Sequence, residues 1–383
     1  MKRLLNRATL VVLAVNAIGL LFFEGATRIL AYYGYIPFRY YPTSDQRVLA
    51  DIDRHFGIWR YPERGSRHQG ACFDVAYVTN SFGMRDRERQ LLLADVPRHV
   101  ILGDSFVEGY GVEASQRFTD ILEDRTGEEY LNFGVSGDFS STQQYLVYRE
   151  LASDFSHDSV AVFLLPDNDF TDNNPAHFEA ERYRPYLRKE KEGGDYQIYY
   201  SVPFAERGKK PELSWGRRFR RTLYNNVYLL NAFRQLGDLF EESELKDRLG
   251  DEVLARQESS YERYSEEDLS KLLWGYQKIA QLAAPRPFNI FVIPREVDFE
   301  TLDTESAYKA VNLIDDLKSS LAEKFSNVQV YDLLPLFKER LEREKREYDD
   351  IFLRCDGHWS PYGHRVVADM IQSVIRKNGR AAS

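Results

Sequence analysis

The chain has 383 residues, of which 43% are hydrophobic and 29% are charged, so it can bury a substantial core and is neither disordered nor of low complexity. Its formal net charge of −9 argues against a general nucleic-acid binder, which would normally carry a basic surface. We therefore expect one main globular domain, with room for an inserted segment, and no nucleic-acid partner.

The N-terminus has the composition of a membrane anchor. Three basic residues open the chain: Lys2, Arg3 and Arg7. They precede an uncharged apolar run over residues 8–23, and this order predicts a signal anchor whose positive end stays in the cytoplasm. A helix needs about 20 residues to cross the hydrocarbon, so we expect residues 8–30 to span the membrane and residues 1–31 to form the anchor. The catalytic domain would then be extracytoplasmic, in the cell envelope or periplasm.

Two charged residues lie near the end of this apolar stretch. Glu24 and Arg28 are one helical turn apart and can pair at the outer membrane interface. The alternative is a contact with a membrane partner, since charges at membrane depth are costly. A cleaved signal peptide is the competing interpretation of the whole segment, although no convincing small-x-small cleavage site follows the apolar run.

The chain has two cysteines, Cys72 and Cys355. If most of the chain lies in an oxidising compartment, they can form one disulfide, worth about 2–4 kcal/mol. Two buried free thiols are the alternative. Residues 32–98, which contain Cys72, are expected to pack on the core, and the cluster over residues 80–85 predicts a strand and turn beside the loop that carries Ser105.

From residue 99 the pattern alternates between strands and helices. The predicted strands, with their terminal turns, cover residues 99–103, 130–137, 159–165, 288–294 and 328–332, and the first two helices cover 117–126 and 142–152. The first three strands, with their intervening helices, each end in small or polar residues, which is typical of a parallel sheet with a site along one edge. The sequence therefore predicts an α/β fold whose core is formed by residues 99–174 and 288–383.

This alternation lapses over residues 175–287, which we interpret as a mainly helical insertion or cap. It contains a basic helix candidate over residues 214–240 and an acidic one over residues 265–283. The run from Arg217 to Arg221 is expected to be a solvated helix face; the alternative is a contact with lipid headgroups or an anionic polymer.

The first predicted strand runs directly into Gly103-Asp104-Ser105. A buried strand followed by a tight turn would lift the Ser105 hydroxyl to the carboxyl edge of the sheet, where open α/β sheets keep their chemistry. A serine is a weak nucleophile unless a histidine takes its proton and nearby donors stabilise the oxyanion that forms.

The C-terminal part supplies a histidine and an acid. Asp356 and His358 directly precede a helix start, where Ser360 and Pro361 are suitable cap and first-turn residues. Asp356 is close enough in sequence to orient His358, as a triad acid does. His364 is expected to be structural. We expect neither a metal site on Asp356, His358 and His364 nor a nucleophilic Cys355, and no cofactor.

These motifs resemble, in order, the four blocks of the SGNH (GDSL-like) hydrolase superfamily: Gly103-Asp104-Ser105, Gly137, Asn168, and Asp356 with His358. The resemblance covers about residues 99–170 and 288–376, and implies a flavodoxin-like three-layer α/β/α sandwich with a parallel central sheet. It further implies that Ser105 is the nucleophile, His358 the general base and Asp356 the orienting acid. The oxyanion hole would be formed by the backbone N–H groups of Ser105 and Gly137 and by the Asn168 amide.

The chain departs from the common pattern at two places. Asp356 precedes His358 by two residues instead of three, and Asp167 stands where the block around Asn168 usually has glycine. The short Asp-x-His-Trp spacing resembles the branch of membrane-associated, extracytoplasmic proteins related to polysaccharide O-acetyltransferases, including those of alginate acetylation.

This resemblance implies a serine esterase or O-acyltransferase. It would remove or transfer small acyl groups, acetyl above all, on an acylated cell-surface or exported glycan, and a multi-spanning membrane acyltransferase would be its partner. Two alternatives stay open: a non-catalytic, membrane-tethered glycan-binding or scaffold protein of an acylation complex, and a lipid esterase.

Overall fold

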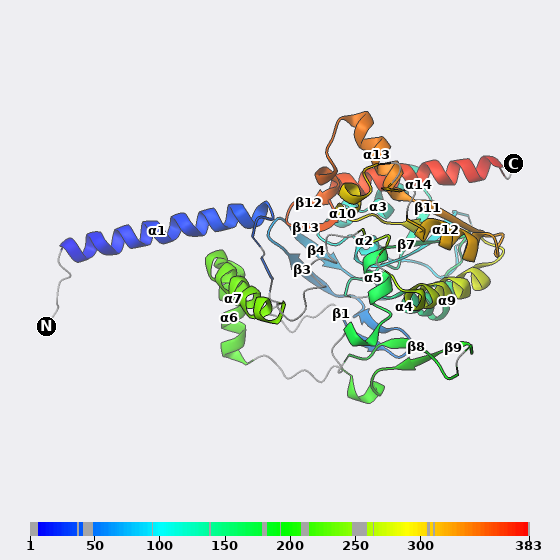
Figure 1. The fold of residues 1–383 in the computed structure, drawn as a ribbon, viewed down its shortest axis with the longest axis horizontal. Coiled ribbons are helices and arrows are strands. Elements are labelled where there is room, and N and C mark those ends of the chain that lie inside the picture. Colours follow the sequence, from blue (N-terminus) through cyan, green and yellow to red (C-terminus); the bar gives the residue numbers. More distant parts are fainter. Residues whose placement is uncertain are drawn as a thin grey trace.

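The N-terminal helix extends away from the folded body of the protein (Figure 1). The computed structural model describes residues 7–36, 38–40, 49–93, 95–137, 139–177, 182–191, 193–207, 214–246, 259–262, 264–304, 307–308 and 311–381. Helix α1 (Arg7–Tyr32) is long and apolar enough to cross a membrane, although a signal sequence has the same character. Lys2 and Arg3 lie outside the described residues.

The core of the domain is a five-stranded parallel sheet. Its strand order is β11-β10-β7-β5-β6, with bounds β5 (Arg98–Leu102), β6 (Glu129–Asn132), β7 (Ser159–Leu164), β10 (Phe288–Val292) and β11 (Val328–Asp332). Each strand begins within one residue of the sequence prediction. Strands β5, β7 and β10 are almost wholly buried, because helices cover both faces of a parallel sheet.

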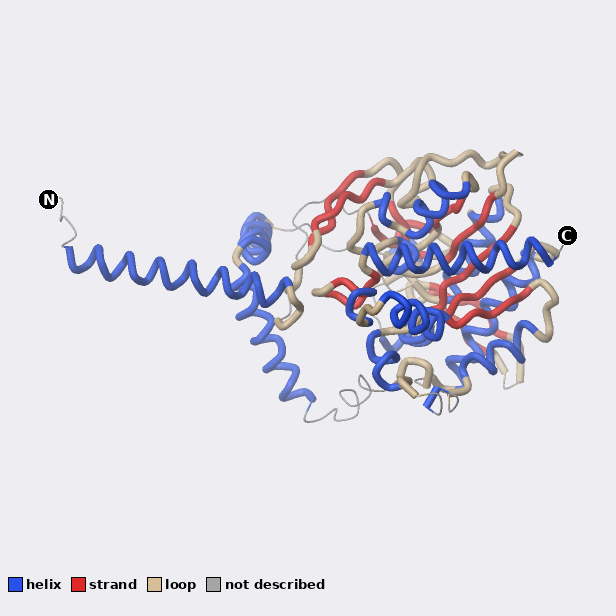
Figure 2. The backbone as a smooth tube through the Cα atoms, turned by 90° about the horizontal axis from the view of Figure 1, so that it is seen from above, coloured by secondary structure: helices blue, strands red, loops and turns tan. Residues whose placement is uncertain are grey.

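Helices form the two outer layers (Figure 1). One layer holds α3 (Phe118–Thr126), α13 (Leu333–Glu344) and α14 (Pro361–Ala381); the other holds α4 (Ser141–Glu150) and α9 (Glu266–Ala283). The predicted three-layer α/β/α sandwich is therefore confirmed. Figure 2 shows the strands of the sheet running side by side beneath α14.

Shorter elements surround the sandwich. The strands pair as antiparallel hairpins: β1 (Leu49–Asp53) with β2 (Gly57–Arg60), β3 (Gly65–Gln69) with β4 (Asp74–Val78), β8 (Pro185–Lys189) with β9 (Tyr196–Tyr200), and β12 (Phe352–Leu353) with β13 (Asp356–Trp359). The described residues also form the α-helices α2 (Ser105–Glu108), α5 (Pro166–Thr171), α6 (Trp215–Asn226), α7 (Tyr228–Lys246), α10 (Glu296–Thr301) and α12 (Leu313–Leu317). Single turns are η1 (Ala114–Gln116), η2 (Ala152–Asp154), η3 (Pro175–His177), η4 (Phe204–Glu206), η5 (Lys318–Ala322) and η6 (Tyr348–Ile351).

The segment predicted as an insertion is not one structural unit. Its last helix, α9, packs in the core against α4, and a Cβ on Gly275 would lie 2.9 Å from the Ser141 carbonyl oxygen. This close approach makes α9 part of the sandwich. The segment also contains the β8–β9 hairpin, which the helical pattern did not predict. The basic helix predicted over residues 214–240 is two helices, because the backbone at Val227 is extended.

Candidate active site

Ser105 is the first residue of α2, directly after β5. The Asp104 carboxylate caps this helix by accepting a hydrogen bond of 2.9 Å from the Phe106 N–H. Such a cap fixes the chain direction at the strand end and holds the serine at the carboxyl edge of the sheet. Ser105 itself is largely buried.

Three predicted residues meet at this edge. His358 Nε2 lies 2.6 Å from Ser105 Oγ, and His358 Nδ1 forms a short hydrogen bond with Asp356 Oδ1. The backbone N–H of His358 donates to the same Asp356 oxygen at 3.1 Å. The three side chains therefore form a continuous serine–histidine–carboxylate chain, the arrangement in which a histidine can take a proton from a serine.

Aromatic rings hold the imidazole of His358 between them. Tyr110 stacks on it with ring centroids 4.1 Å apart, and Phe106 contacts it at 4.9 Å. Both residues follow Ser105 closely in sequence, so the segment that carries the serine also orients the histidine. The sequence motifs gave no indication of Tyr110 as a contact.

The hairpin that carries His358 is tied to the N-terminal segment. Cys72 and Cys355 form a disulfide with Cα atoms 5.8 Å apart, and it joins the turn between β3 and β4 to the turn that precedes Asp356. This bond leaves no thiol on Cys355 to act as a nucleophile. On its other side the hairpin is anchored by Trp359, which is fully buried in the core.

Burial raises the pKa of each carboxyl group around the triad and hydrogen bonds lower it, and the balance between the two differs from one group to the next. Burial raises the pKa of Asp356, but the hydrogen bonds from His358 outweigh it and hold that pKa below its usual value. At Asp104 burial dominates and raises the pKa to about 6. Asp169 is also fully buried, and burial together with the Asp104 charge raises its pKa well above the usual value. Asp356 is therefore the carboxylate best kept ionised beside the histidine.

Asn168 lies on α5, next to the helix that carries Ser105. Its side-chain amide donates to Asp104 Oδ2 at 3.3 Å, so Asp104 joins the predicted nucleophile to the predicted oxyanion donor. Asp167, which replaces the usual glycine, forms an ion pair of 2.7 Å with Arg295. This ion pair holds the Asp167 side chain against Arg295.

Gly137 lies in the loop after β6 at a φ of +94°, a conformation that favours glycine. The same loop is fixed to the serine helix by Glu108, whose carboxylate accepts from the Ser136 N–H at 3.1 Å. The fold thus links the loop of Gly137 to α2 through one side chain.

Glu108 and its partners are the main site residues that the sequence reasoning missed. Glu108 and Arg60 are each 1% exposed and form a buried ion pair. Arg60 also donates to the Gly134 carbonyl at 2.6 Å. Burial raises the pKa of Glu108, but Arg60 and further hydrogen bonds hold it below the usual value. The only sequence signal was the position of Glu108 three residues after Ser105.

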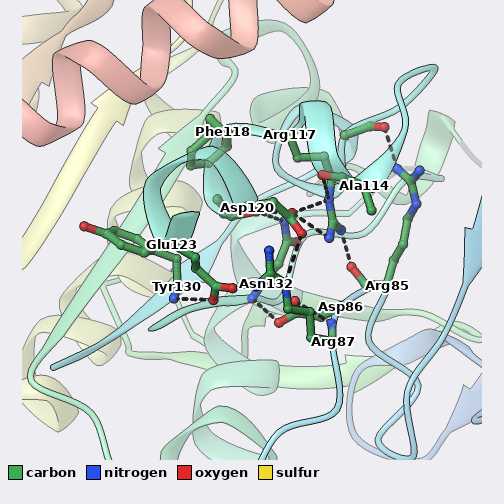
Figure 3. Close-up of polar contacts among 12 residues, drawn as sticks. Arg85, Asp86, Arg87, Ala114, Arg117, Phe118, Asp120, Glu123, Tyr130 and Asn132 are labelled. Carbon is green, nitrogen blue, oxygen red and sulfur yellow. Dashed lines mark hydrogen bonds and ion pairs between the residues drawn. The ribbon is translucent and has the colours of Figure 1, made fainter. Parts of the chain in front are cut away.

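The cluster over residues 80–85 packs beside the serine helix, as predicted. The Arg85 guanidinium is buried and donates to the carbonyls of Glu108 and Gly109, at 3.0 and 2.6 Å. Figure 3 shows how polar contacts extend from here: the Arg117 side chain bonds the Arg85 carbonyl, and Asp86 accepts from the Asn132 N–H at 3.1 Å. This network fixes the N-terminal segment to α3 and β6.

His364 lies behind the site and faces the core. It is 1% exposed, its Nδ1 accepts a long hydrogen bond of 3.4 Å from the Phe118 N–H, and burial lowers its pKa to about 3. Such a histidine stays neutral and structural. Across the described parts of the chain, no group of three His, Cys, Asp or Glu side chains is arranged to hold a metal ion.

Comparisons with known proteins match the C-terminal part of this site. Residues 295–383 match the family model of the SGNH hydrolase-like domain of the acetyltransferase AlgX, which includes Asp356 and His358. A search of curated proteins found no match.

Similar solved structures include a member of the lipolytic protein G-D-S-L family from Veillonella parvula DSM 2008. It is 14% identical with a TM-score of 0.37, and the match covers 73% of this chain and 98% of that one. Another is a carbohydrate esterase family 2 enzyme with a carbohydrate-binding domain from Corynascus thermopiles (Myceliophthora fergusii). It is 12% identical with a TM-score of 0.36, and the match covers 74% of this chain and 68% of that one.

Proposed function

We propose that this chain, whose residues 295–383 match the SGNH hydrolase-like domain of the acetyltransferase AlgX, is a serine esterase or O-acyltransferase that forms an acyl-enzyme on Ser105. The observation that supports this most directly is the hydrogen-bonded chain from Ser105 through His358 to Asp356. A serine with a histidine at 2.6 Å and a carboxylate behind it is the arrangement of an activated nucleophile.

In the proposed first step, His358 Nε2 takes the hydroxyl proton of Ser105 as Oγ attacks the ester carbonyl. Asp356 accepts the Nδ1–H bond, which fixes the tautomer with a free Nε2 and stabilises the imidazolium that forms. The tetrahedral intermediate then collapses, its C–O bond to the leaving alcohol breaks, and His358 returns the proton to that alcohol. The acyl group stays on Ser105 as an ester.

The oxyanion of this intermediate needs donors aimed at it. We assign this role to the backbone N–H groups of Ser105 and Gly137 and to the Asn168 amide. Asp104 supports the assignment, because it binds one N–H of the Asn168 amide and so restricts the direction of the other.

In the second step a hydroxyl group attacks the acyl-enzyme, with His358 again as the base. Water as the acceptor gives an esterase, and a sugar hydroxyl gives an O-acyltransferase. The match to an acetyltransferase-type domain and the apolar α1 support an acetyl group on an exported or cell-surface glycan, handled outside the cytoplasm. A multi-spanning membrane acyltransferase that supplies the acyl group fits the same proposal.

The test is the hydrolysis of p-nitrophenyl acetate and labelling by an activated-serine probe, both with the full-length chain and with Ser105→Ala. We expect turnover and labelling in the wild type and neither in the variant. A folded wild type that is inert to both reagents would favour the scaffold alternative.

Adding acetylatable oligosaccharides to the same assay separates hydrolysis from transfer. Acetylated sugar as a product would identify the transferase, and release of acetate alone would identify the esterase. Faster turnover of long-chain esters than of acetate would favour a lipid esterase.

A further inference from the structure

Helices α6 and α7 are bound to the outer half of α1. The Glu24 carboxylate accepts from the N–H groups of Tyr228 and Leu229, at 3.0 and 2.9 Å, and so caps the N-terminus of α7. Arg28, which pairs with Glu24 at 2.8 Å as predicted, donates to the Asn226 carbonyl at the end of α6 at 2.5 Å. One charged pair on α1 thus holds the ends of both helices.

Contacts beyond α1 strengthen this attachment. The Tyr228 ring lies under the Arg28 guanidinium and stacks on Phe38, with ring centroids 4.2 Å apart. The side chain of Asn231 bonds both the N–H and the carbonyl of Arg39, at 3.2 and 2.8 Å. The two helices α6 and α7 are therefore fixed both to α1 and to the segment that follows α1.

The two helices run across the axis of α1. In Figure 1, α6 and α7 both run in directions that differ from that of α1. Glu24 comes 17 residues after Arg7, which is about 26 Å along a helix, close to the thickness of a hydrocarbon core of about 30 Å. If α1 spans a bilayer, the pair lies in the plane of its outer surface.

The α6–α7 pair exposes an apolar face. On α6 the residues Trp215, Phe219 and Leu223 recur every four positions and so share one side of the helix, with Trp215 81% exposed and Phe219 59% exposed. On α7, Phe233 is 64% exposed, and Leu230 and Leu236 are also exposed.

The opposite side of α6 is basic. Four arginines and no acid lie on this helix: Arg217, Arg218, Arg220 and Arg221. At 100° per residue, Arg217, Arg220 and Arg221 fall on the side away from Trp215 and Phe219. A short helix with an aromatic apolar face and a basic opposite face is typical of a segment that lies in a membrane interface.

We propose that α6 and α7 form a second membrane contact, which lies in the outer interface of the bilayer that α1 crosses. The apolar residues of both helices enter the headgroup–acyl boundary, and the arginines of α6 bind anionic lipid headgroups. This contact restricts how far the catalytic domain can tilt relative to the plane of the membrane. The proposal goes beyond the catalytic function and does not depend on it.

Tryptophan fluorescence tests the contact in the full-length chain, reconstituted in vesicles of phosphatidylcholine and phosphatidylglycerol with brominated acyl chains. Trp215 is the tryptophan of the α6–α7 pair; the others are Trp59, Trp274 and Trp359 in the globular domain, and α1 has none. We expect bromolipid quenching in the wild type, loss of most of it in Trp215→Phe, and no loss of it in the control Trp274→Phe.

The arginines are tested by reversing two of their charges, Arg217→Glu with Arg220→Glu. Quenching of Trp215 should fall to about half or less, since arginines are attracted to an anionic lipid surface and glutamates are repelled by it. Thiol titration under denaturing conditions, which reports the Cys72–Cys355 disulfide, checks that every variant has folded.

Two results would overturn the proposal. One is the absence of bromolipid quenching of Trp215 although protease protection shows α1 inserted. The other is shielding of Trp215 only when a membrane protein is added, which would assign the apolar face to a protein partner.

Discussion

The residues around the triad differ in what each of them does. Ser105 and His358 are placed to exchange a proton, whereas Asp356 acts on the histidine. Glu108 and Tyr110 touch no reacting atom in the proposed mechanism and act as positioning residues. These roles predict different effects for neighbouring substitutions.

Asp356→Asn should lower kcat on p-nitrophenyl acetate by roughly 10³ to 10⁴-fold, because an amide can hold His358 in the wrong tautomer. Steady-state kinetics measure this fall. The matched control is Asp350→Asn, an exposed carboxylate outside the triad, and its kcat should stay within about twofold of the wild type. Equal losses in the two variants would contradict the role given to Asp356.

Glu108→Gln should lower the free energy of unfolding by about 3–5 kcal/mol, since it leaves the buried Arg60 charge without its partner. The control is Asp74→Asn in the Arg67–Asp74 pair, whose side chains are 65% and 46% exposed, so that its loss should leave the free energy of unfolding close to that of the wild type. Urea unfolding compares the two. A Glu108 variant as stable as the control would refute the structural role of the buried pair.

The neutral His364 predicts a pH dependence of stability. In the unfolded chain a histidine binds a proton near pH 6.5, whereas in the fold burial lowers the pKa of His364 to about 3. Between these values the unfolded state holds more protons, so His364 contributes a loss of stability as the pH falls, by about 1.4 kcal/mol per pH unit.

His364→Gln removes the imidazole that titrates and keeps a side-chain acceptor for the Phe118 N–H. Between pH 6.5 and 5 the free energy of unfolding of the variant should therefore fall less steeply than that of the wild type, by about 1.4 kcal/mol per pH unit. Urea unfolding at both pH values measures this difference. The same substitution at the exposed His55 serves as the control. A decline unchanged in His364→Gln would show that this histidine is not held neutral.

Among the elements, the disulfide has the clearest consequence. It joins residues 283 positions apart and ties the β3–β4 turn to the hairpin of Asp356 and His358. Replacing both cysteines with serine should lower stability by about 2–4 kcal/mol and also lower kcat/KM, because the triad hairpin loses its tether.

Dithiothreitol should not change the stability or the kcat/KM of the double serine variant. In the wild type it should lower both to the values of that variant. Unfolding curves and p-nitrophenyl acetate kinetics with and without reductant measure both effects. A fully active, equally stable double variant would show that the tether does not position the triad.

The five sheet strands could be predicted from the sequence because short stretches rich in apolar and β-branched residues alternate with helical patterns. The triad could be predicted for the same reason, since Ser105 follows one of these strands directly and His358 precedes a capped helix. Roles in catalysis, by contrast, stay predictions until they are measured. Glu108 could not be foreseen as a buried acid, because its partner Arg60 lies 48 residues away in another element.

Local patterns also fail where distant segments decide the structure. The break between α6 and α7 follows from Glu24, which caps α7 from α1. Helix α9 has an ordinary amphipathic pattern, and its packing against α4, where Gly275 lies close to Ser141, places it in the sandwich. The β3–β4 and β8–β9 hairpins lack the strict apolar alternation that predicts strands.

At the scale of the whole molecule, three parts follow one another: the apolar α1, the α6–α7 pair bound to it, and the α/β/α sandwich (Figure 1). In the proposed arrangement α1 lies in the membrane and the sandwich lies outside it. A disulfide beside the site agrees with an oxidising compartment. We therefore expect the sandwich to act on ester groups close to the outer membrane surface.

The most direct test of this account is to trap the acyl-enzyme. The full-length protein is mixed with p-nitrophenyl acetate, quenched in acid within the first turnover, digested and mapped by mass spectrometry. The account predicts one acetyl group on the peptide that contains Ser105, and none on that peptide in His358→Ala. Turnover by a wild type that carries no acetyl group on Ser105 at any time point would contradict it.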